Sequence, residues 1–446
     1  MMKYEISILG LKLKLEYSGN LSSVRRRVGI SQRKTQGGLH MKRVMLSLIV
    51  VALVMTGVFA AGEKESLTPG VTDTKIVFGY TMPLTGPIGF IGNQTLESVK
   101  AEFNRVNDAG GIHGRKLEVI AYDSGMDVAQ AVANYRRLIT EDKVFALLFG
   151  FGSVTRPAYS LIEQNQIPWL FPMAPPEDMM FPARKYLFSL FPTTATQVRT
   201  MAAWLESEGQ FKRISVVYGD SASGKTGLDR FMTEAKDRNL NVVASEAIVE
   251  TAPSAAVQIA KIRQADPDLV VIMGMTMQPA AVIIKEIRRT GMDSQIMVNM
   301  PISNSVLLSL IADDQPEGII GCYWGEVEYS PERGHYGTAE MQAMADTLIK
   351  YYPEYAKAGS NIGGSVEHGL SVKLLTDALE KAGPDLTREK LIQTLESFKD
   401  YPTGKGSYAT FSPTRREGVA GGVILQVKNG WWQPISDWID VELPEN

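Results

Sequence analysis

The sequence predicts an α/β protein with two lobes, each built on a mostly parallel sheet. The chain has 446 residues, 44% of them apolar, which is long enough for two domains with buried cores. From Lys75 onward, short apolar runs rich in β-branched residues alternate with longer segments of helical period, as in βαβ units. The same alternation begins again at Arg213, so we expect a second sheet of similar construction.

The first lobe is expected to begin with a strand at residues 75–80. Residues 92–107 then place apolar side chains three and four residues apart, as on one face of a helix. Ala109, Gly110 and Gly111 end that helix in a turn. The other expected elements of this lobe are strands at 116–122, 144–149, 167–171 and 186–188 and helices at 128–140 and 156–164.

The second lobe repeats this construction. Its strands are expected at 213–218, 241–244, 268–273, 295–299 and 318–321, with helices between them. Later in the chain, helices at 339–351 and 366–381 and strands at 404–411 and 422–428 are expected to pack back onto the two lobes. Two similar lobes in sequence predict a cleft between them, outside the carboxyl ends of the strands.

Composition and charge argue against several classes of function. The net charge of −3 and the pI near 6.0 leave no basic excess, so nucleic acid is not an expected partner. Cys322 is the single cysteine and is expected to be a core residue. The four histidines lack the spacing of zinc ligands, and we expect neither a disulfide, a metal site nor a cofactor.

A secretory signal peptide is predicted at residues 41–61. Lys42 and Arg43 follow Met41 as a short basic head, residues 44–59 are almost entirely apolar, and small residues follow at the expected cleavage point near Ala60 or Ala61. An uncleaved membrane anchor is the alternative. Residues 1–40 have no place in such a signal and are interpreted as a non-native upstream extension. No cysteine lies at the cleavage point, so we expect a soluble periplasmic protein without a lipid anchor there.

Several motifs occur in the order typical of one family. Residues 83–87 read Pro-Leu-Thr-Gly-Pro, and residues 109–116 read Ala-Gly-Gly-Ile-His-Gly-Arg-Lys before the second strand and Asp123. This stretch resembles the start of the branched-chain amino acid receptors, the type I periplasmic solute-binding proteins of ABC importers. The resemblance continues at residues 155–158, Pro172, 285–291 and 378–383, and so covers nearly the whole mature chain.

The resemblance implies a Venus-flytrap: two lobes that close on a small-molecule ligand about a hinge of three crossovers. Crossovers would fall near Pro192, Glu326 and Lys405. The lobes would comprise residues 75–192 with 327–405, and 193–326 with 406–443. The implied partners are the permease and ATPase subunits of an importer, on separate chains, and the receptor itself is expected to be a monomer. An exported ligand-sensing receptor is the alternative and would need a membrane span after the lobes.

The candidate binding residues follow the strands of both lobes. Residues 150–153, Gly-Phe-Gly-Ser, come between a buried strand and a helix, where free N–H groups could hold a carboxylate; a simple glycine turn is the alternative. Residues 173–175 end the next strand and are expected on the same wall, or in a turn of purely structural importance. The candidate residues are Phe90, Phe151, Gly152, Ser153, Met173, Ala174, Pro175, Tyr218, Ser221, Ser223, Thr276, Met300 and Trp324.

This chain departs from the amino acid receptors at five positions. Where they usually show Tyr, Thr, Tyr, Tyr and an acidic residue, it has Ile91, Pro175, Ser223, Thr276 and Met300. A buried ligand ammonium needs a compensating charge or several acceptors, so the missing acid leaves an amino acid and another small organic solute equally open. Glu326 or Glu328 could supply the charge, although solvated surface is the simpler interpretation of both.

One motif is typical of an enzyme. Residues 219–226 read Gly-Asp-Ser-Ala-Ser-Gly-Lys-Thr, which matches the P-loop of nucleotide triphosphatases. Such activity would need Lys225 on the phosphates and Thr226 on magnesium. An export signal into a compartment without ATP, and the lack of a later strand ending in a suitable Asp, argue against it. We therefore interpret the motif as a strand-to-helix turn facing the cleft, and we expect no enzymatic activity.

Overall fold

The computed structural model describes residues 2–8, 11–17, 68–86, 88–300, 302, 305–312, 316–325, 337–357, 360 and 362–443. The chain divides into two units, residues 1–62 and 63–446. In the first unit, β1 (Met2–Ile8) and β2 (Leu11–Tyr17) pair as antiparallel strands. The expected signal peptide at 41–61 lies outside the described residues. No helix in the described part of the chain is long and apolar enough to cross a membrane.

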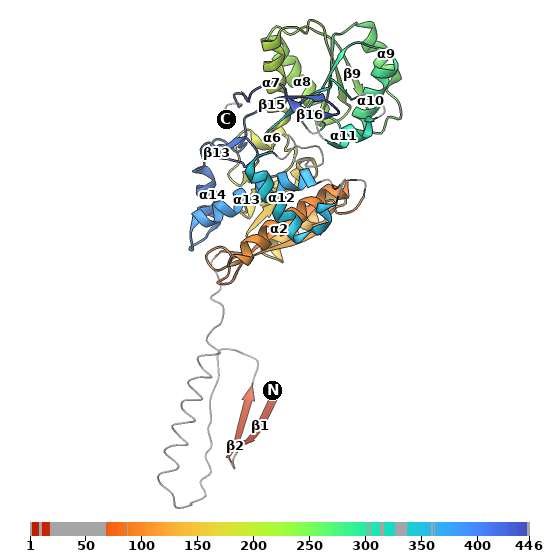
Figure 1. Ribbon diagram of the computed structural model, residues 1–446. Coiled ribbons are helices and arrows are strands. Elements are labelled where there is room, and N and C mark those ends of the chain that lie inside the picture. The colour runs from red at the N-terminus through yellow and green to blue at the C-terminus, as the bar shows by residue number, and fades with distance from the viewer. Residues whose placement is uncertain are drawn as a thin grey trace, which may run out of the picture. The chain divides into compact units, whose positions relative to one another are not determined.

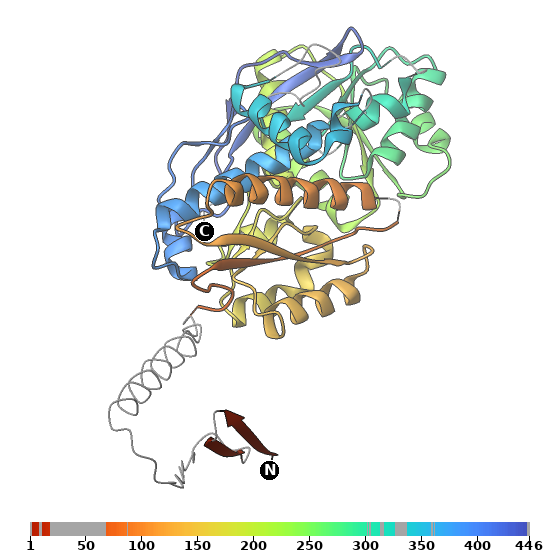
Figure 2. The same ribbon diagram turned by 60° about the horizontal axis from the view of Figure 1, so that its bottom comes forward.

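The first lobe of the second unit is a five-stranded parallel sheet between helices (Figure 1). Its elements are β3 (Lys75–Met82), α2 (Gly89–Asp108), β4 (Lys116–Asp123), α3 (Val128–Thr140), β5 (Ala146–Leu148), α4 (Gly152–Thr155), η1 (Arg156–Ala158), α5 (Tyr159–Gln164), β6 (Trp169–Leu170), α6 (Glu177–Met180) and β7 (Leu187–Phe188). The strand order is β4-β3-β5-β6-β7. Alternate residues of β3 face opposite layers: Phe78 packs in one apolar cluster with α2, and Val77 in another with α3. Figure 2 shows these two helices on opposite faces of the sheet.

The second lobe contains a larger mixed sheet. Its elements are α7 (Thr194–Glu208), β8 (Ile214–Gly219), α8 (Ala222–Asp237), β9 (Val242–Ile248), α9 (Ala256–Gln264), β10 (Leu269–Met273), α10 (Met277–Arg289), β11 (Gln295–Val298), α11 (Ser305–Leu310), β12 (Ile320–Tyr323), β15 (Gly421–Lys428), β16 (Trp431–Pro434) and β17 (Ile439–Asp440). The order is β16-β15-β12-β11-β10-β8-β9, with β17 beside β15. The strands from β8 to β12 are parallel, whereas β15 runs antiparallel to β12.

Residues between β12 and β15 return to the first lobe. The described elements there are α12 (Ala339–Tyr351), η4 (Pro353–Ala356), α13 (Ile362–Ala382), α14 (Arg388–Glu396), β13 (Tyr401–Pro402) and β14 (Tyr408–Ala409). Helices α12 and α13 pack on α2, with Ala101 of α2 in one apolar cluster with Met341 and Val366. The chain therefore passes between the lobes after β7, after β12 and before β15. This confirms the predicted fold class of two doubly wound α/β lobes joined by three crossovers.

Two predicted strands need correction. The strand expected at 404–411 is reduced to β14, because Gly404 and Gly406 have φ of +81° and +77°, which breaks the extended backbone. The strand expected at 241–244 continues to Ile248 as β9 at the edge of the sheet. Cys322 is buried, as predicted, and burial raises the pKa of its thiol to about 12, which keeps it protonated.

Candidate functional site

Two loops at the carboxyl edge of the first sheet are joined into one surface. The N–H of Gly152, after β5, donates to the carbonyl of Met173 at 3.0 Å, and the Met173 N–H donates to Gly150 at 2.9 Å. The N–H groups of Val154 and Thr155 both donate to Phe151, at 3.1 and 2.9 Å. The amides of 152, 154 and 155 are thus bonded within the protein and are not free to hold an anion.

The candidate residues of these loops differ in exposure. Phe151 and Met173 are half-buried and Ala174 is exposed, whereas Gly152 and Pro175 are buried. A Cβ on Gly152 would lie 2.8 Å from the Cα of Pro175, so glycine is required for this close approach. The Ser153 side chain lies outside the described residues. The exposed part of this wall is therefore largely apolar.

Phe90 and Ile91 follow the neighbouring strand β3, at the start of α2. Phe90 is 43% exposed, and Ile91 is half-buried against the main core. The loop before them is held by Asp123 at the end of β4, which accepts the Leu84 N–H at 2.7 Å and the Thr85 hydroxyl at 2.6 Å. These bonds, together with the Gly125 amide, lower the pKa of Asp123 despite its partial desolvation.

The P-loop-like motif is a close-packed turn in the second lobe. A Cβ on Gly224 would lie 1.9 Å from the Gly219 carbonyl oxygen, and one on Gly274 would lie 2.4 Å from the Gly224 Cα. Ser221 caps α8 by accepting the Gly224 N–H at 3.1 Å, and Lys225 pairs with Asp220 at 2.8 Å. The glycines are explained by backbone packing, and the serine and lysine have partners inside the protein.

Glu250 is an acid at the carboxyl edge of the second sheet that the sequence analysis missed. It lies two residues beyond β9, and its carboxylate accepts the Thr276 hydroxyl at 2.7 Å and the Thr276 N–H at 3.2 Å. Because β8 lies between β9 and β10, this side chain crosses the carboxyl end of β8. The exposed Thr276 thus holds an exposed carboxylate at this edge of the sheet.

The remaining candidates of the second lobe are more enclosed. Tyr218, the penultimate residue of β8, is half-buried, and Met300, after β11, is only 4% exposed. Trp324 is 2% exposed and lies where the chain leaves β12. Glu326 and Glu328 fall outside the described residues.

Trp324 belongs to a group of side chains that we call the hinge cluster: Phe191, Tyr323, Trp324, Glu367 and Lys405. Lys405 is 1% exposed; its Nζ lies 3.6 Å from the centre of the Trp324 ring and 3.1 Å from the Glu367 carboxylate. Tyr323 donates a hydrogen bond to Glu367, and Phe191 packs on Trp324 with 5.0 Å between ring centres. The cluster thus joins residues next to the first two crossovers, and Lys405 between β13 and β14, to Glu367 of α13.

An ion pair also joins the two lobes away from the hinge cluster. Arg230 of α8 contacts Glu177, the first residue of α6, at 2.5 Å, with both side chains mostly covered. Because α6 follows β6 and α8 follows β8, the pair lies between the carboxyl-edge segments of the two sheets. Opening of the lobes would have to break it.

Comparison with known proteins identifies the family. The sequence profile of the family described as periplasmic binding protein matches residues 75–431. The Leu/Ile/Val-binding protein of Escherichia coli (strain K12) is 27% identical over 240 residues, which cover 53% of this chain and 64% of that protein. The match thus spans slightly less than two thirds of that relative. A leucine-, isoleucine-, valine-, threonine- and alanine-binding protein of Pseudomonas aeruginosa is 22% identical over 324 residues, 72% of this chain and 82% of its own.

Solved structures share the fold at low sequence identity. The fatty acid ABC transporter substrate-binding protein from Thermomonospora curvata has a TM-score of 0.69 and 23% identity, over 85% of this chain and 96% of its own. A branched chain amino acid ABC transporter from Thermus thermophilus with bound valine has a TM-score of 0.70 and 17% identity, over 82% and 97%. Since the family profile covers most of the chain and the two-lobed fold agrees with it, this chain belongs to the periplasmic binding protein family.

Proposed function

We propose that this protein captures a small solute outside the cytoplasmic membrane and delivers it to the permease of an ABC importer. The observation that carries the proposal is the pair of sheets joined by three crossovers, with an ion pair between segments that follow their carboxyl ends. Such a fold binds by closing, and no covalent step is needed. The protein would work as a monomer in the periplasm after export directed by residues 41–61, with separate ATPase subunits powering transport.

The proposed binding surface combines an apolar wall with a polar wall. The first lobe contributes the half-buried Phe151 and Met173 together with the exposed Phe90. The second lobe contributes Ser223 and Thr276, and we add Glu250 to the sequence-based candidates because it lies at the same edge. A solute with an apolar body and a polar head fits such a pair of walls.

We infer that the solute is an aliphatic amino acid. Relatives named for leucine, isoleucine and valine support this class, and the exposed carboxylate of Glu250 provides the charge that Met300 cannot give to an ammonium. The name of the Thermomonospora curvata protein supports a competing class, a fatty acid, which carries no ammonium. Glu250 therefore distinguishes the two classes.

A thermal-shift screen of the purified protein tests the proposal. The panel contains aliphatic and aromatic amino acids, matched carboxylic acids without the amino group, medium-chain fatty acids, and ATP with magnesium. A solute at ~100 times its dissociation constant stabilises the fold by about 2.7 kcal/mol, which raises the melting temperature measurably. Stabilisation by leucine or valine is the expected result, and stabilisation by ATP alone would overturn the receptor function.

The variant Glu250→Gln then identifies the head group. With an amino acid as solute, we expect its affinity to fall by about tenfold or more, because the ammonium loses its counter-charge. With a fatty acid, the affinity should stay the same or rise, because the carboxylate of the solute no longer faces the carboxylate of Glu250. Asp237→Asn, an exposed acid at the far end of α8, is the matched control and should bind like the parent protein.

A further inference from the structure

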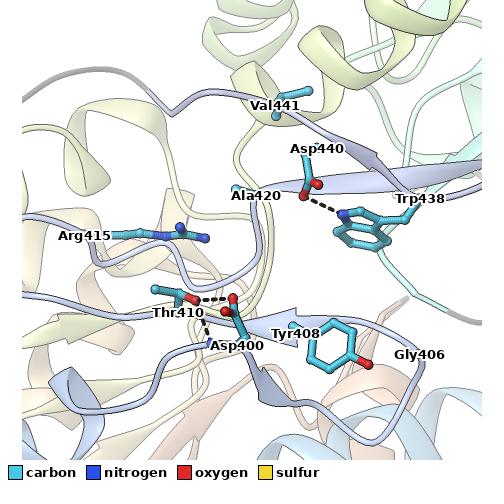
Figure 3. A pocket seen from close by; sticks show the side chains of 9 residues that line it. All are labelled: Asp400, Gly406, Tyr408, Thr410, Arg415, Ala420, Trp438, Asp440 and Val441. Carbon is cyan, nitrogen blue, oxygen red and sulfur yellow. Dashed lines mark hydrogen bonds between the residues drawn. The ribbon is translucent and has the colours of Figure 1, made fainter.

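A cavity lies next to the third crossover, and its lining differs from the candidate solute site. It is a partly open pocket with a volume of about 510 Å³, within the range of small-molecule sites. None of the sequence-based candidate residues lines it. Figure 3 shows the lining residues, which come from the β13–β14 region, from the segment after it and from β17: Asp400, Gly406, Tyr408, Thr410, Arg415, Ala420, Trp438, Asp440 and Val441.

The walls of this cavity are anchored to different lobes. The β13–β14 hairpin is tied to the first lobe, since Tyr401 donates to Asp377 of α13 at 2.9 Å and Thr338, before α12, donates to Gly404 at 2.5 Å. The opposite wall, β17, pairs with β15 in the sheet of the second lobe. A molecule bound here would therefore contact both lobes.

Three charged side chains face the cavity from three directions (Figure 3). The Asp400 carboxylate accepts the Thr410 hydroxyl at 3.2 Å, and Asp440 accepts the Trp438 indole N–H at 2.8 Å. Neither Asp has a cationic side chain within ion-pair distance among the described residues. Arg415 is oriented by two hydrogen bonds to backbone carbonyls. Its Nε donates to the carbonyl oxygen of Glu417 at 3.1 Å, and its Nη2 donates to that of Gly418 at 2.9 Å.

The electrostatics of the cavity favour a positively charged guest. The lining carries two carboxylates against one guanidinium. Burial lowers the pKa of Arg415, and Glu417, Asp400 and Asp440 act in the opposite direction, so the acids already stabilise one cation here. A guest bearing only negative charge would be repelled by both aspartates.

Two aromatic rings complete the lining. Tyr408 is 60% exposed, an unusual position for a large apolar side chain, and the Trp438 ring is half-buried on the opposite wall. Ammonium groups bind to the faces of such rings, where the contribution is about 0.5–2 kcal/mol. Aromatic faces and carboxylates together are the side chains that recognise alkylammonium ions.

We propose that this cavity is a second binding site, for a small organic cation that bears a primary ammonium group. The ammonium would bind Asp400 and Asp440 between the rings of Tyr408 and Trp438. Two sources share this chemistry: a linear diamine, and a basic amino acid whose carboxylate would additionally reach Arg415. This site is separate from the cleft of the proposed function and does not depend on the identity of the transported solute.

Isothermal titration calorimetry with 1,4-diaminobutane and with lysine tests the proposal, with butane-1,4-diol as the uncharged analogue. We expect saturable binding of at least one cation with Kd of about 0.1–1 mM, and none of the diol. The double variant Asp400→Asn, Asp440→Asn should weaken binding by about tenfold or more. Asp437→Asn, an exposed acid beside Trp438 that does not line the cavity, should bind like the parent protein.

The variant Arg415→Met distinguishes the two sources. It should tighten diamine binding, because a competing cation is removed, and should weaken lysine binding if the ligand carboxylate contacts the guanidinium. No saturable binding of either cation would overturn the site. A loss of affinity in Asp437→Asn as large as that in the double variant would also overturn the site, because it would be an effect of net charge alone. Binding that is lost in Glu250→Gln and kept in the double variant would assign the cation to the cleft, and so overturn the second site.

Discussion

The hinge cluster and the loops at the carboxyl edges of the sheets use similar charged side chains in opposite surroundings. At the hinge, Lys405 and Glu367 pair at 3.1 Å with almost no exposure. At the edge of the second sheet, Lys225 and Asp220 pair at 2.8 Å while largely exposed. A buried pair is stabilising only as long as both partners are present, whereas an exposed pair contributes little to stability.

These two settings indicate that stability depends on the hinge cluster and that recognition is expected at the loops. In the proposed function, the hinge would keep its geometry while the lobes move, and buried charges with defined partners would hold the crossovers in one arrangement. The loops would exchange protein contacts for solute contacts, which is consistent with their solvated charges. Substitutions of similar chemistry should therefore damage the fold at the hinge and leave it intact at the loops.

The largest effect is expected for Lys405→Met. It leaves Glu367 buried without its cation, which should lower the free energy of unfolding by about 3–5 kcal/mol in urea titrations. The double variant Lys405→Met, Glu367→Gln should recover part of this loss, because the uncompensated charge is gone. Lys428→Met, at an exposed position, serves as the control. An equal loss in the control would contradict the buried-pair interpretation.

A pH-dependent effect of about 2–3 kcal/mol is expected from Glu417, which is fully buried between the first and third crossovers. Its Oε1 accepts the Thr193 N–H at 2.9 Å, and burial raises the pKa of this acid from 4.5 to about 7. The folded protein thus holds a proton that the unfolded chain releases above pH 4.5. This contribution to stability is complete below pH 4.5 and is lost as the pH rises through 7.

Glu417→Gln removes this titration without changing the shape of the side chain. The difference in unfolding free energy between parent and variant, measured at pH 5 and at pH 8, should shift in favour of the variant at the higher pH. A difference that stays constant between the two pH values would show that Glu417 is charged in the folded protein throughout the range.

A smaller effect is expected for Arg230→Gln, which breaks the ion pair with Glu177 between the lobes. If the closed arrangement is destabilised by about 1 kcal/mol, the ratio of open to closed molecules rises by about fivefold. Small-angle X-ray scattering should therefore report a larger radius of gyration than for the parent protein. Arg289→Gln, whose partner Glu286 lies on the same helix, should leave the radius unchanged.

The smallest effect is expected for Lys225→Met at the exposed loop. Its partner Asp220 is also exposed, and the neighbouring turn depends on glycine packing and on the Ser221 cap. The urea midpoint should match the parent protein, and no ATP binding should be detected in either. A clear loss of stability would mean that the loop, like the hinge, depends on its charges.

The sequence was sufficient where local signals mark an element. The helices at 128–140 and 339–351 were predicted with the bounds that the structure has. Each begins at a side-chain cap, where Asp127 and Thr338 accept the N–H groups of Gln130 and Met341. The strand order could not be read from spacing, since it depends on which helices cover which face. The fold class followed from the alternation and the resemblance together.

The candidate site was harder to predict, for physical reasons that differ between residues. Glu250 was missed because the polar Ser245 and Glu246 of the edge strand β9 interrupt the apolar pattern, so the strand was ended too early. The pairing of Glu177 with Arg230 has no local signal. Lys405 was expected in a strand near a crossover, and nothing in the local sequence indicates that its ammonium is buried beside Glu367.

The order of the elements along the chain also bears on secretion. The sheet of the second lobe needs β15, from Gly421 onward, beside β12, and the first lobe needs α12 and α13 to cover α2. Until residues 339–382 have been made, the first lobe lacks the helices that cover α2, and until the residues from 421 onward have been made, the second sheet lacks β15. Under the proposed export, a chain handed to an export channel during synthesis would therefore be incompletely folded, because both lobes are completed by segments from the last quarter of the sequence.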